Sequence, residues 1–241
     1  MFVRFLAAAL LLFAALPALA DTVIVGGLKR TFTVTCPSNP CGVKMPVMFV
    51  FHGRLQAASS IASEAKFEAH GVRAIMVYPL GRPTLAWSWN AGAEPPQTWA
   101  EVHASDDVGF VKAILAYLDG KYHIDRSRVF AAGLSNGGQF AWELACKTNL
   151  FAGIASVAGA MNDPKCRPDS HPRVLVISGT VDKVELWKGG GAAADAPFQT
   201  GIDLFRAAGS PVTVLRPTGG HHGWVQPGID TTATVTKFFG L

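Results

Sequence analysis

The sequence has few charged residues and no blocks of one charge. Charged residues make up 16% of the 241 positions, and hydrophobic residues make up 49%. This balance excludes an intrinsically disordered chain and a coiled coil. Lysine and arginine are scattered along the chain, so the basic patch that is typical of nucleic-acid-binding proteins is missing. The length fits one sizeable core, and we expect a single domain with no nucleic-acid partner.

Long hydrophobic runs are also lacking, except at the start of the chain. Residues 1–20 combine a positive charge at Arg4, an apolar run over 5–16 and a small-residue cleavage site ending at Ala20. These are the three parts of a secretory signal peptide, and an uncleaved anchor is the alternative. After residue 20 no stretch reaches the ~20 apolar residues of a transmembrane helix. We expect a secreted or periplasmic protein with a mature domain over 21–241 and no membrane partner.

Only four cysteines are present, and their spacing fits no zinc site. In an exported chain, disulfides are the better interpretation. Three pairings are possible for four cysteines. We favour Cys36–Cys41, because these residues bracket a turn-forming segment, and this choice leaves Cys146 to pair with Cys166. No metal and no cofactor is expected.

Short apolar runs alternate with longer helical patterns along the mature chain. Unbroken apolar runs are typical of strands that are buried on both faces of a parallel sheet. Such strands are predicted at residues 46–51, 72–78, 128–132, 153–157, 173–178 and 212–215. Residues 31–35 alternate in polarity and are rich in β-branched residues, which predicts an early edge strand or hairpin. Helices are predicted at residues 57–70, 106–120, 136–147, 197–208 and 230–239. Asp106 and Asp107 are expected to cap the second helix. The alternation predicts an α/β fold with a mostly parallel sheet flanked by helices.

One serine lies between a predicted strand and a predicted helix. Residues 133–137 read GLSNG and fit the G-x-S-x-G motif. In this context the motif indicates a nucleophile elbow, a sharp turn that exposes the serine at the top of an α/β-hydrolase sheet. At the start of a helix, the developing negative charge on Ser135 would be stabilised by free N–H groups. Ser135 is the predicted nucleophile.

A serine nucleophile needs a general base that is oriented by a carboxylate. In this fold the acid and the histidine follow the serine in that order. Asp182 comes after the apolar run 174–177, and His222 comes after the run 212–215. Both positions are at carboxyl ends of strands, where the sites of open α/β sheets form. His171 precedes its strand and is expected to lie away from the site.

The acid and the base each have neighbours of the same type. Glu185 and Asp195 follow the same predicted strand as Asp182 and could replace it. His221 directly precedes His222, and sequence position alone separates the two weakly. A metal site at this histidine pair is not favoured, because no carboxylate or cysteine cluster accompanies it.

Ester hydrolysis also needs N–H donors for the oxyanion of its transition state. The backbone N–H of Asn136, which follows Ser135, is the expected first donor. The second is expected from the loop after His52, at Arg54 or at Leu55. His52 itself is expected to stabilise this turn rather than to act as a second base.

Several further motifs occur in a fixed order along the chain. They are His52-Gly53, WSWNAG at 87–92, DDVGF at 106–110, GLSNGG at 133–138, Val181-Asp182 and His222-Gly223-Trp224. From about residue 46 to about residue 228 the sequence therefore resembles the feruloyl esterase and poly(3-hydroxybutyrate) depolymerase-like family of secreted α/β-hydrolases. The resemblance implies a triad of Ser135, Asp182 and His222, and its His-x-Trp pattern favours His222 over His221.

The expected substrate follows from the walls of the site. Trp87, Trp89 and Trp224 are candidates to line an acyl or aryl pocket, and buried packing is the alternative role for each. Residues 158–172 between two predicted strands are too few for a lid domain, which indicates an open cleft. We expect hydrolysis of aryl or short acyl esters in the manner of a feruloyl esterase.

Other functions fit the same motifs less well. A poly(3-hydroxybutyrate)-type polyester depolymerase is the main alternative, and an acetylxylan esterase or a serine peptidase are weaker ones. A binding protein with an inactive triad is the alternative from outside the enzymes.

Overall fold

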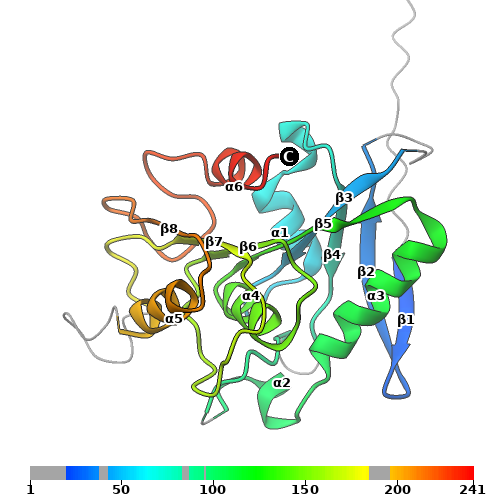
Figure 1. Cartoon of the computed structure of the whole chain (residues 1–241), viewed down its shortest axis with the longest axis horizontal. Coiled ribbons are helices and arrows are strands. Elements are labelled where there is room, and N and C mark those ends of the chain that lie inside the picture. The colour runs from blue at the N-terminus through cyan, green and yellow to red at the C-terminus, as the bar shows by residue number, and fades with distance from the viewer. Residues whose placement is uncertain (1–19, 38–42, 83–86, 95, 185–195) are drawn as a thin grey trace, which may run out of the picture.

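An eight-stranded sheet forms the centre of the protein (Figure 1). The computed structural model describes residues 20–37, 43–82, 87–94, 96–184 and 196–241. Nearly all of the predicted signal peptide, residues 1–19, therefore lies outside the described residues. The same holds for Cys41, the predicted partner of Cys36, and for the alternative acids Glu185 and Asp195.

The strands are ordered β1-β2-β4-β3-β5-β6-β7-β8 across the sheet. Pairing is antiparallel from β1 to β2 and from β2 to β4, and parallel between all other neighbours. This mostly parallel sheet confirms the predicted α/β-hydrolase fold. The strands are β1 (Asp21–Val25), β2 (Leu28–Thr35), β3 (Met45–Phe51), β4 (Ile75–Pro79), β5 (Ile124–Leu134), β6 (Gly153–Val157), β7 (Arg173–Ile177) and β8 (Val212–Leu215).

Helices cover both faces of the sheet, as Figure 1 shows. In β3 alternate residues point to opposite faces, so Phe49 and Phe51 pack with α3, α4 and α5, while Met48 and Val50 pack with α1 and α6. All residues of this strand are buried, as expected for a strand covered on both sides. The helices are α1 (Ala58–Ala65), the 3₁₀ turn η1 (Glu68–His70), α2 (Trp99–Val102), α3 (Asp107–Lys121), α4 (Asn136–Lys147), α5 (Ala196–Ala207) and α6 (Thr231–Phe239).

Three differences from the predicted elements have local causes. The predicted helix 57–70 is interrupted at Lys66, which adopts a left-handed φ of 51° and ends α1. The predicted strand 128–132 is part of a longer strand, β5, whose exposed first half carries polar residues. Strand β1 and the short helix α2 were not predicted, because five alternating residues at an edge and a four-residue helix give weak patterns.

The connection between β6 and β7 matters for access to the sheet edge. Residues 158–172 form no helix and no strand, in agreement with the prediction that no lid domain is inserted there.

Within the described ranges, no helix has the length and apolar character that a membrane crossing requires.

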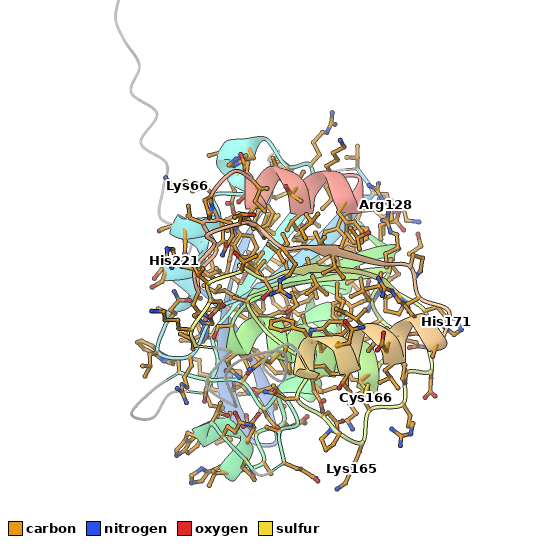
Figure 2. All side chains as sticks on the ribbon, turned by 90° about the vertical axis from the view of Figure 1, so that its left-hand side faces the viewer. Lys66, Arg128, Lys165, Cys166, His171 and His221 are labelled. Carbon is orange, nitrogen blue, oxygen red and sulfur yellow. A yellow bond between two sulfur atoms is a disulfide. The ribbon has the colours of Figure 1, made fainter. Side chains whose placement is uncertain are left out.

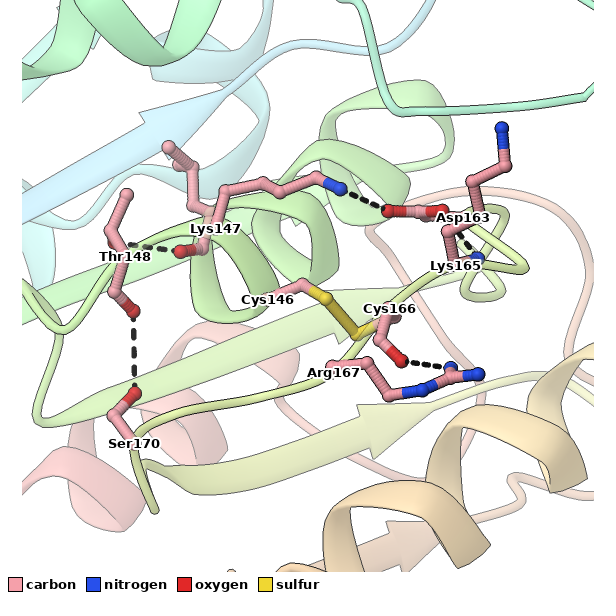
Figure 3. The surroundings of a disulfide bond; sticks show 9 residues. Cys146, Lys147, Thr148, Asp163, Lys165, Cys166, Arg167 and Ser170 are labelled. Carbon is pink, nitrogen blue, oxygen red and sulfur yellow. Dashed lines mark hydrogen bonds and ion pairs between the residues drawn. A yellow bond between two sulfur atoms is a disulfide. The ribbon is translucent and has the colours of Figure 1, made fainter.

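A disulfide fastens this connection to the helix that precedes β6 (Figure 3). Cys146 near the end of α4 is bonded to Cys166, and both side chains are buried. Beside it, Lys147 Nζ lies 2.7 Å from Asp163 Oδ2. The predicted pairing of Cys146 with Cys166 is confirmed, and it limits the movement of the β6–β7 connection against α4.

Candidate active site

The turn between β5 and α4 has the geometry of a nucleophile elbow. Ser135 has φ 54° and ψ −121°, a backbone conformation that costs a non-glycine residue energy. A Cβ on Gly133 would lie 2.2 Å from the carbonyl oxygen of Gly137, and one on Gly137 would lie 2.3 Å from that of Phe51. The motif glycines are thus required by close backbone contacts. The turn leaves Ser135 partly exposed between buried neighbours.

Asp182 and His222 form a hydrogen-bonded pair on the loops after β7 and β8. The distance between His222 Nδ1 and Asp182 Oδ2 is 2.9 Å, and the Asp182 side chain is only 3% exposed. The two loops are joined by a hydrogen bond from the Val181 N–H to the Gly220 carbonyl, which holds the pair together. An Nδ1–H that donates to a carboxylate leaves the other ring nitrogen, Nε2, free to accept a proton.

His221 lies differently from its neighbour. Its residue is exposed, and its carbonyl accepts a hydrogen bond from Gln226 Nε2 at 2.8 Å. Figure 2 shows His221 at the opposite end of the molecule from Arg128 and His171. His171 thus lies at the amino ends of the strands, as predicted. Of the two adjacent histidines, it is His222 that contacts a carboxylate.

Ser135 and the Asp182–His222 pair are located at the same edge of the sheet. Each follows the carboxyl end of a parallel strand, and β5, β6, β7 and β8 are successive neighbours. In the part of the chain that the structure describes, the Ser135 hydroxyl makes no hydrogen bond, to His222 or to any other group. Such bonds between nucleophile and base are often long before a substrate is bound.

Some of the backbone N–H groups near Ser135 are available to bind an oxyanion, and others are already hydrogen-bonded. Among the described residues, the N–H groups of Asn136 and Arg54 have no acceptor. The Leu55 N–H, by contrast, donates to the Trp87 carbonyl at 3.0 Å. The alternative that Leu55 supplies the second oxyanion donor is therefore wrong, because this N–H is already used. Arg54 is the candidate that the geometry leaves.

His52 supports the turn that carries Arg54. Its Nδ1–H donates to the Gly53 carbonyl at 2.8 Å, and its Nε2 accepts from the Gly81 N–H at 2.9 Å. Complete burial lowers the pKa of His52 to about 4, against the opposing effect of the Gly53 carbonyl. The imidazole is therefore neutral and fully hydrogen-bonded. This agrees with the prediction that His52 is not a second base.

The three tryptophans do not form a common pocket wall. Trp89 and Trp224 are 0% and 1% exposed, and their indole N–H groups donate to the His52 carbonyl and to Thr232 Oγ1, both at 2.9 Å. The expectation that these two rings face a substrate is therefore corrected, and the packing alternative holds for them. Trp87 is partly exposed.

The two aspartates of the DDVGF motif have separate roles. Asp106 caps α3 as predicted, with its side chain accepting from the Gly109 N–H at 2.7 Å. Asp107 is buried and is not a cap. It forms an ion pair with Arg30 at 2.6 Å and accepts from the Asn90 N–H at 2.8 Å. Arg30 was not predicted, because it lies 77 positions away in the sequence.

A further buried acid, Glu143, lies on α4 next to Gly92. A Cβ on Gly92 would lie 2.6 Å from Glu143 Oε2, and this oxygen has no hydrogen-bond partner among the described residues. Burial, with a smaller contribution from the neighbouring Asp163 carboxylate, raises the pKa of Glu143 to about 7 against the opposing effect of Lys147. Glu143 is thus an acid whose ionisation falls near neutral pH.

The fold and the elbow together define the structural class, which is the α/β-hydrolase fold. No protein-family model matches the chain. The chain is 33% identical to NocK of Nocardia uniformis subsp. tsuyamanensis, named as an esterase, over 74% of this chain and 53% of that protein. It is 29% identical to a protein of Aspergillus niger named as feruloyl esterase C, over 52% of this chain and 44% of that protein.

Solved structures agree with this assignment of the fold. A ferulic acid esterase from Anaeromyces mucronatus, solved with ferulic acid, superposes with a TM-score of 0.63 at 17% identity, over 92% of this chain and 89% of that one. The chain spans about half the length of the curated relatives it matches. These comparisons support the resemblance found in the sequence: the chain has the α/β-hydrolase fold and is similar to proteins named as esterases and feruloyl esterases.

The raised pKa of Glu143 predicts a pH-dependent effect of Glu143→Gln. Between the ordinary value of 4.5 and about 7, the unfolded chain ionises while the folded protein stays protonated, so wild-type stability falls as the pH rises through this interval. The variant avoids this loss. We expect it to be more stable than the wild type by about 2–3 kcal/mol at pH 8 and equally stable at pH 4. Urea unfolding at a series of pH values measures the difference.

Asp169→Asn, at an exposed position with no ion pair or hydrogen bond among the described residues, is the control and is expected to follow the wild type at every pH. A Glu143→Gln difference that does not change between pH 4 and pH 8 would contradict the raised pKa.

Proposed function

We propose that the chain is a serine carboxylic ester hydrolase that acts through an acyl-enzyme on Ser135. The observation that carries this proposal is the strained elbow at Ser135, located at the same sheet edge as a buried aspartate bonded to a histidine at 2.9 Å. In this proposal Asp182 and His222 complete the triad. The similarity to proteins named as esterases supports the assignment.

The proposed reaction assigns one task to each group. His222 Nε2 takes the proton of the Ser135 hydroxyl as Oγ attacks the carbonyl carbon, and the Asn136 and Arg54 N–H groups bind the oxyanion. The imidazolium then gives its proton to the departing alcohol, which leaves Ser135 acylated. Water, deprotonated by the same nitrogen, releases the acid and restores the serine. Asp182 holds the imidazole in the required tautomer throughout.

The proposed substrates are aryl or short acyl esters, with feruloyl-type esters first. Exposed apolar side chains stand on the loops that carry the site: Leu55 is 67% exposed, Val181 39% and Val225 75%. Together with the short connection 158–172, they favour an open, apolar approach to Ser135. Export to the periplasm or the exterior is part of the proposal, supported by the signal-like residues 1–20 and compatible with the disulfide.

Ser135→Ala is expected to reduce kcat on p-nitrophenyl acetate by several orders of magnitude while the melting temperature changes little. The triad acts as a unit, so loss of the nucleophile removes nearly all of its contribution. A fluorophosphonate should add its phosphonyl group to Ser135 in the wild type and not in the variant, as mass spectrometry of peptides would show. Ser59→Ala, an exposed serine on α1, is the control. Unchanged turnover by Ser135→Ala would refute the proposal.

His222→Ala is expected to lower kcat about 10³-fold or more, and His221→Ala less than about fivefold. The two positions are adjacent, yet His222 contacts Asp182 while His221 is exposed. Steady-state kinetics of the two variants under identical conditions give the comparison. The opposite ranking would transfer the role of base to His221.

Substrate preference is expected to separate the proposed activity from its alternatives. We expect kcat/KM for methyl ferulate to exceed that for hydroxybutyrate oligomers by at least about tenfold, because contact with an aryl ring adds roughly 1–3 kcal/mol to transition-state binding. Initial rates on methyl ferulate, hydroxybutyrate oligomers and acetylated xylan measure this preference. Faster release from the oligomers would favour the polyester depolymerase, and release of acetate alone would favour an acetylxylan esterase.

A further inference from the structure

The backbone N–H and the backbone carbonyl of Trp89 are both hydrogen-bonded to one side chain, that of Asn136. Its N–H donates to Asn136 Oδ1 at 2.8 Å, and its carbonyl accepts from Asn136 Nδ2 at 3.3 Å. The Asn136 side chain is buried. A carboxamide has the acceptor and the donor that this pairing needs, whereas an ionised carboxylate only accepts. Asn136 thus bonds to Trp89 as a residue of a neighbouring strand would.

The Trp89 ring is held between the two segments that carry the proposed oxyanion donors. It stacks on Phe140, one turn after Asn136 on α4, with 5.1 Å between ring centroids. Its indole N–H donates to the carbonyl of His52 at 2.9 Å, two residues before Arg54. Two residues before Trp89, the Trp87 carbonyl accepts a hydrogen bond from the Leu55 N–H. Segment 87–89 therefore contacts both loops on either side of the oxyanion site.

Three of the residues that follow Trp89, up to Ala93, are hydrogen-bonded to buried carboxylates. The Asn90 N–H is bound by Asp107, which is paired with Arg30. The N–H groups of Ala91 and Ala93 donate to Glu101 Oε1, each at 3.3 Å. Segment 89–93 is thus anchored to α2 and α3 as well as to the elbow.

We propose that Asn136 and Trp89 form a brace that sets the spacing of the two oxyanion N–H groups. The proposal rests on the proposed ester hydrolysis. Asn136 then has two roles: its backbone N–H binds the oxyanion, and its side chain is a positioning group for that N–H. Donors of this kind must lie within a few tenths of an ångström of their place, because their contribution depends on preorganisation.

Asn136→Asp and Asn136→Ala test the brace. Both keep the backbone N–H, and both remove the bond from Nδ2 to the Trp89 carbonyl. We expect kcat to fall about 10- to 100-fold with KM within about twofold of the wild type, because a misplaced donor weakens transition-state binding alone. Trp89→Phe, which keeps a ring but lacks the N–H donor to His52, probes the brace from the other side. Trp89→Phe also tests the brace if the Asn136 variants do not fold.

Inhibitor binding separates positioning from a structural role. A trifluoromethyl ketone forms a tetrahedral oxyanion on Ser135, while the matching amide mimics the ground state. We expect the variants to lose affinity for the ketone by the same factor as kcat/KM and to bind the amide as the wild type does. Phe239→Leu, a buried residue packed against Gly153 at the amino ends of the strands, is the control. It should lower the melting temperature and leave the ketone-to-amide ratio unchanged.

The outcomes distinguish the two proposals. Asn136 and Trp89 variants that melt earlier but keep kcat and the ketone-to-amide ratio would overturn the brace. Variants that lose ketone and amide affinity equally would do the same. A wild-type protein that neither turns over esters nor reacts with a fluorophosphonate would instead overturn the proposed function.

Discussion

The backbone turn at Ser135 is the constraint on which the arrangement of the site depends. Its left-handed φ of 54° costs roughly 1–3 kcal/mol, and it persists because bonds on both sides hold it. The Ser135 N–H donates to the Val157 carbonyl of β6, and the Ser135 carbonyl accepts the Gln139 N–H of α4. Strand, turn and helix are thereby fixed against one another, and the turn leaves Ser135 partly exposed at the carboxyl ends of the strands, where the loops after β7 and β8 also begin.

Segment 89–93 lies next to this turn, and its backbone N–H groups are hydrogen-bonded to side chains. Asn136, Asp107 and Glu101 accept hydrogen bonds from the N–H groups of residues 89, 90 and 91, and segment 89–93 pairs with no strand among the described residues. Buried carboxylates are costly unless they are paired or hydrogen-bonded, and Arg30 supplies the pairing charge for one of them. The result is an irregular segment whose backbone N–H groups are hydrogen-bonded to side chains instead of to a neighbouring strand.

The same framework occurs in enzymes whose sequences differ widely. Solved esterases superpose on most of the chain at 16–17% identity, which reflects the fold and not the substrate. In such folds the chemistry depends on the residues at the sheet edge and on the loops around them. The apolar side chains of Leu55, Val181 and Val225 belong to those loops, which is why the proposed preference is for apolar acyl or aryl groups.

The sequence by itself determined the fold class and the elbow at Ser135, because these follow from local patterns. The pairing of Cys146 with Cys166 was predicted only as the remainder after Cys36 was assigned to Cys41, and the structure confirms it. The sequence also named Asp182 and His222, whose contact is confirmed, while their joint role with Ser135 remains proposed.

The tertiary structure decided what depends on contacts between distant segments. Sequence could not show that Arg30 pairs with Asp107 across 77 positions, nor that the Trp89 ring is buried rather than exposed on a pocket wall. Nor could it separate Arg54 from Leu55, since one backbone N–H is consumed by a carbonyl more than thirty residues away. Local sequence patterns indicate which residues are buried and which are exposed. Which backbone N–H group has no hydrogen-bond acceptor depends on how distant segments pack together.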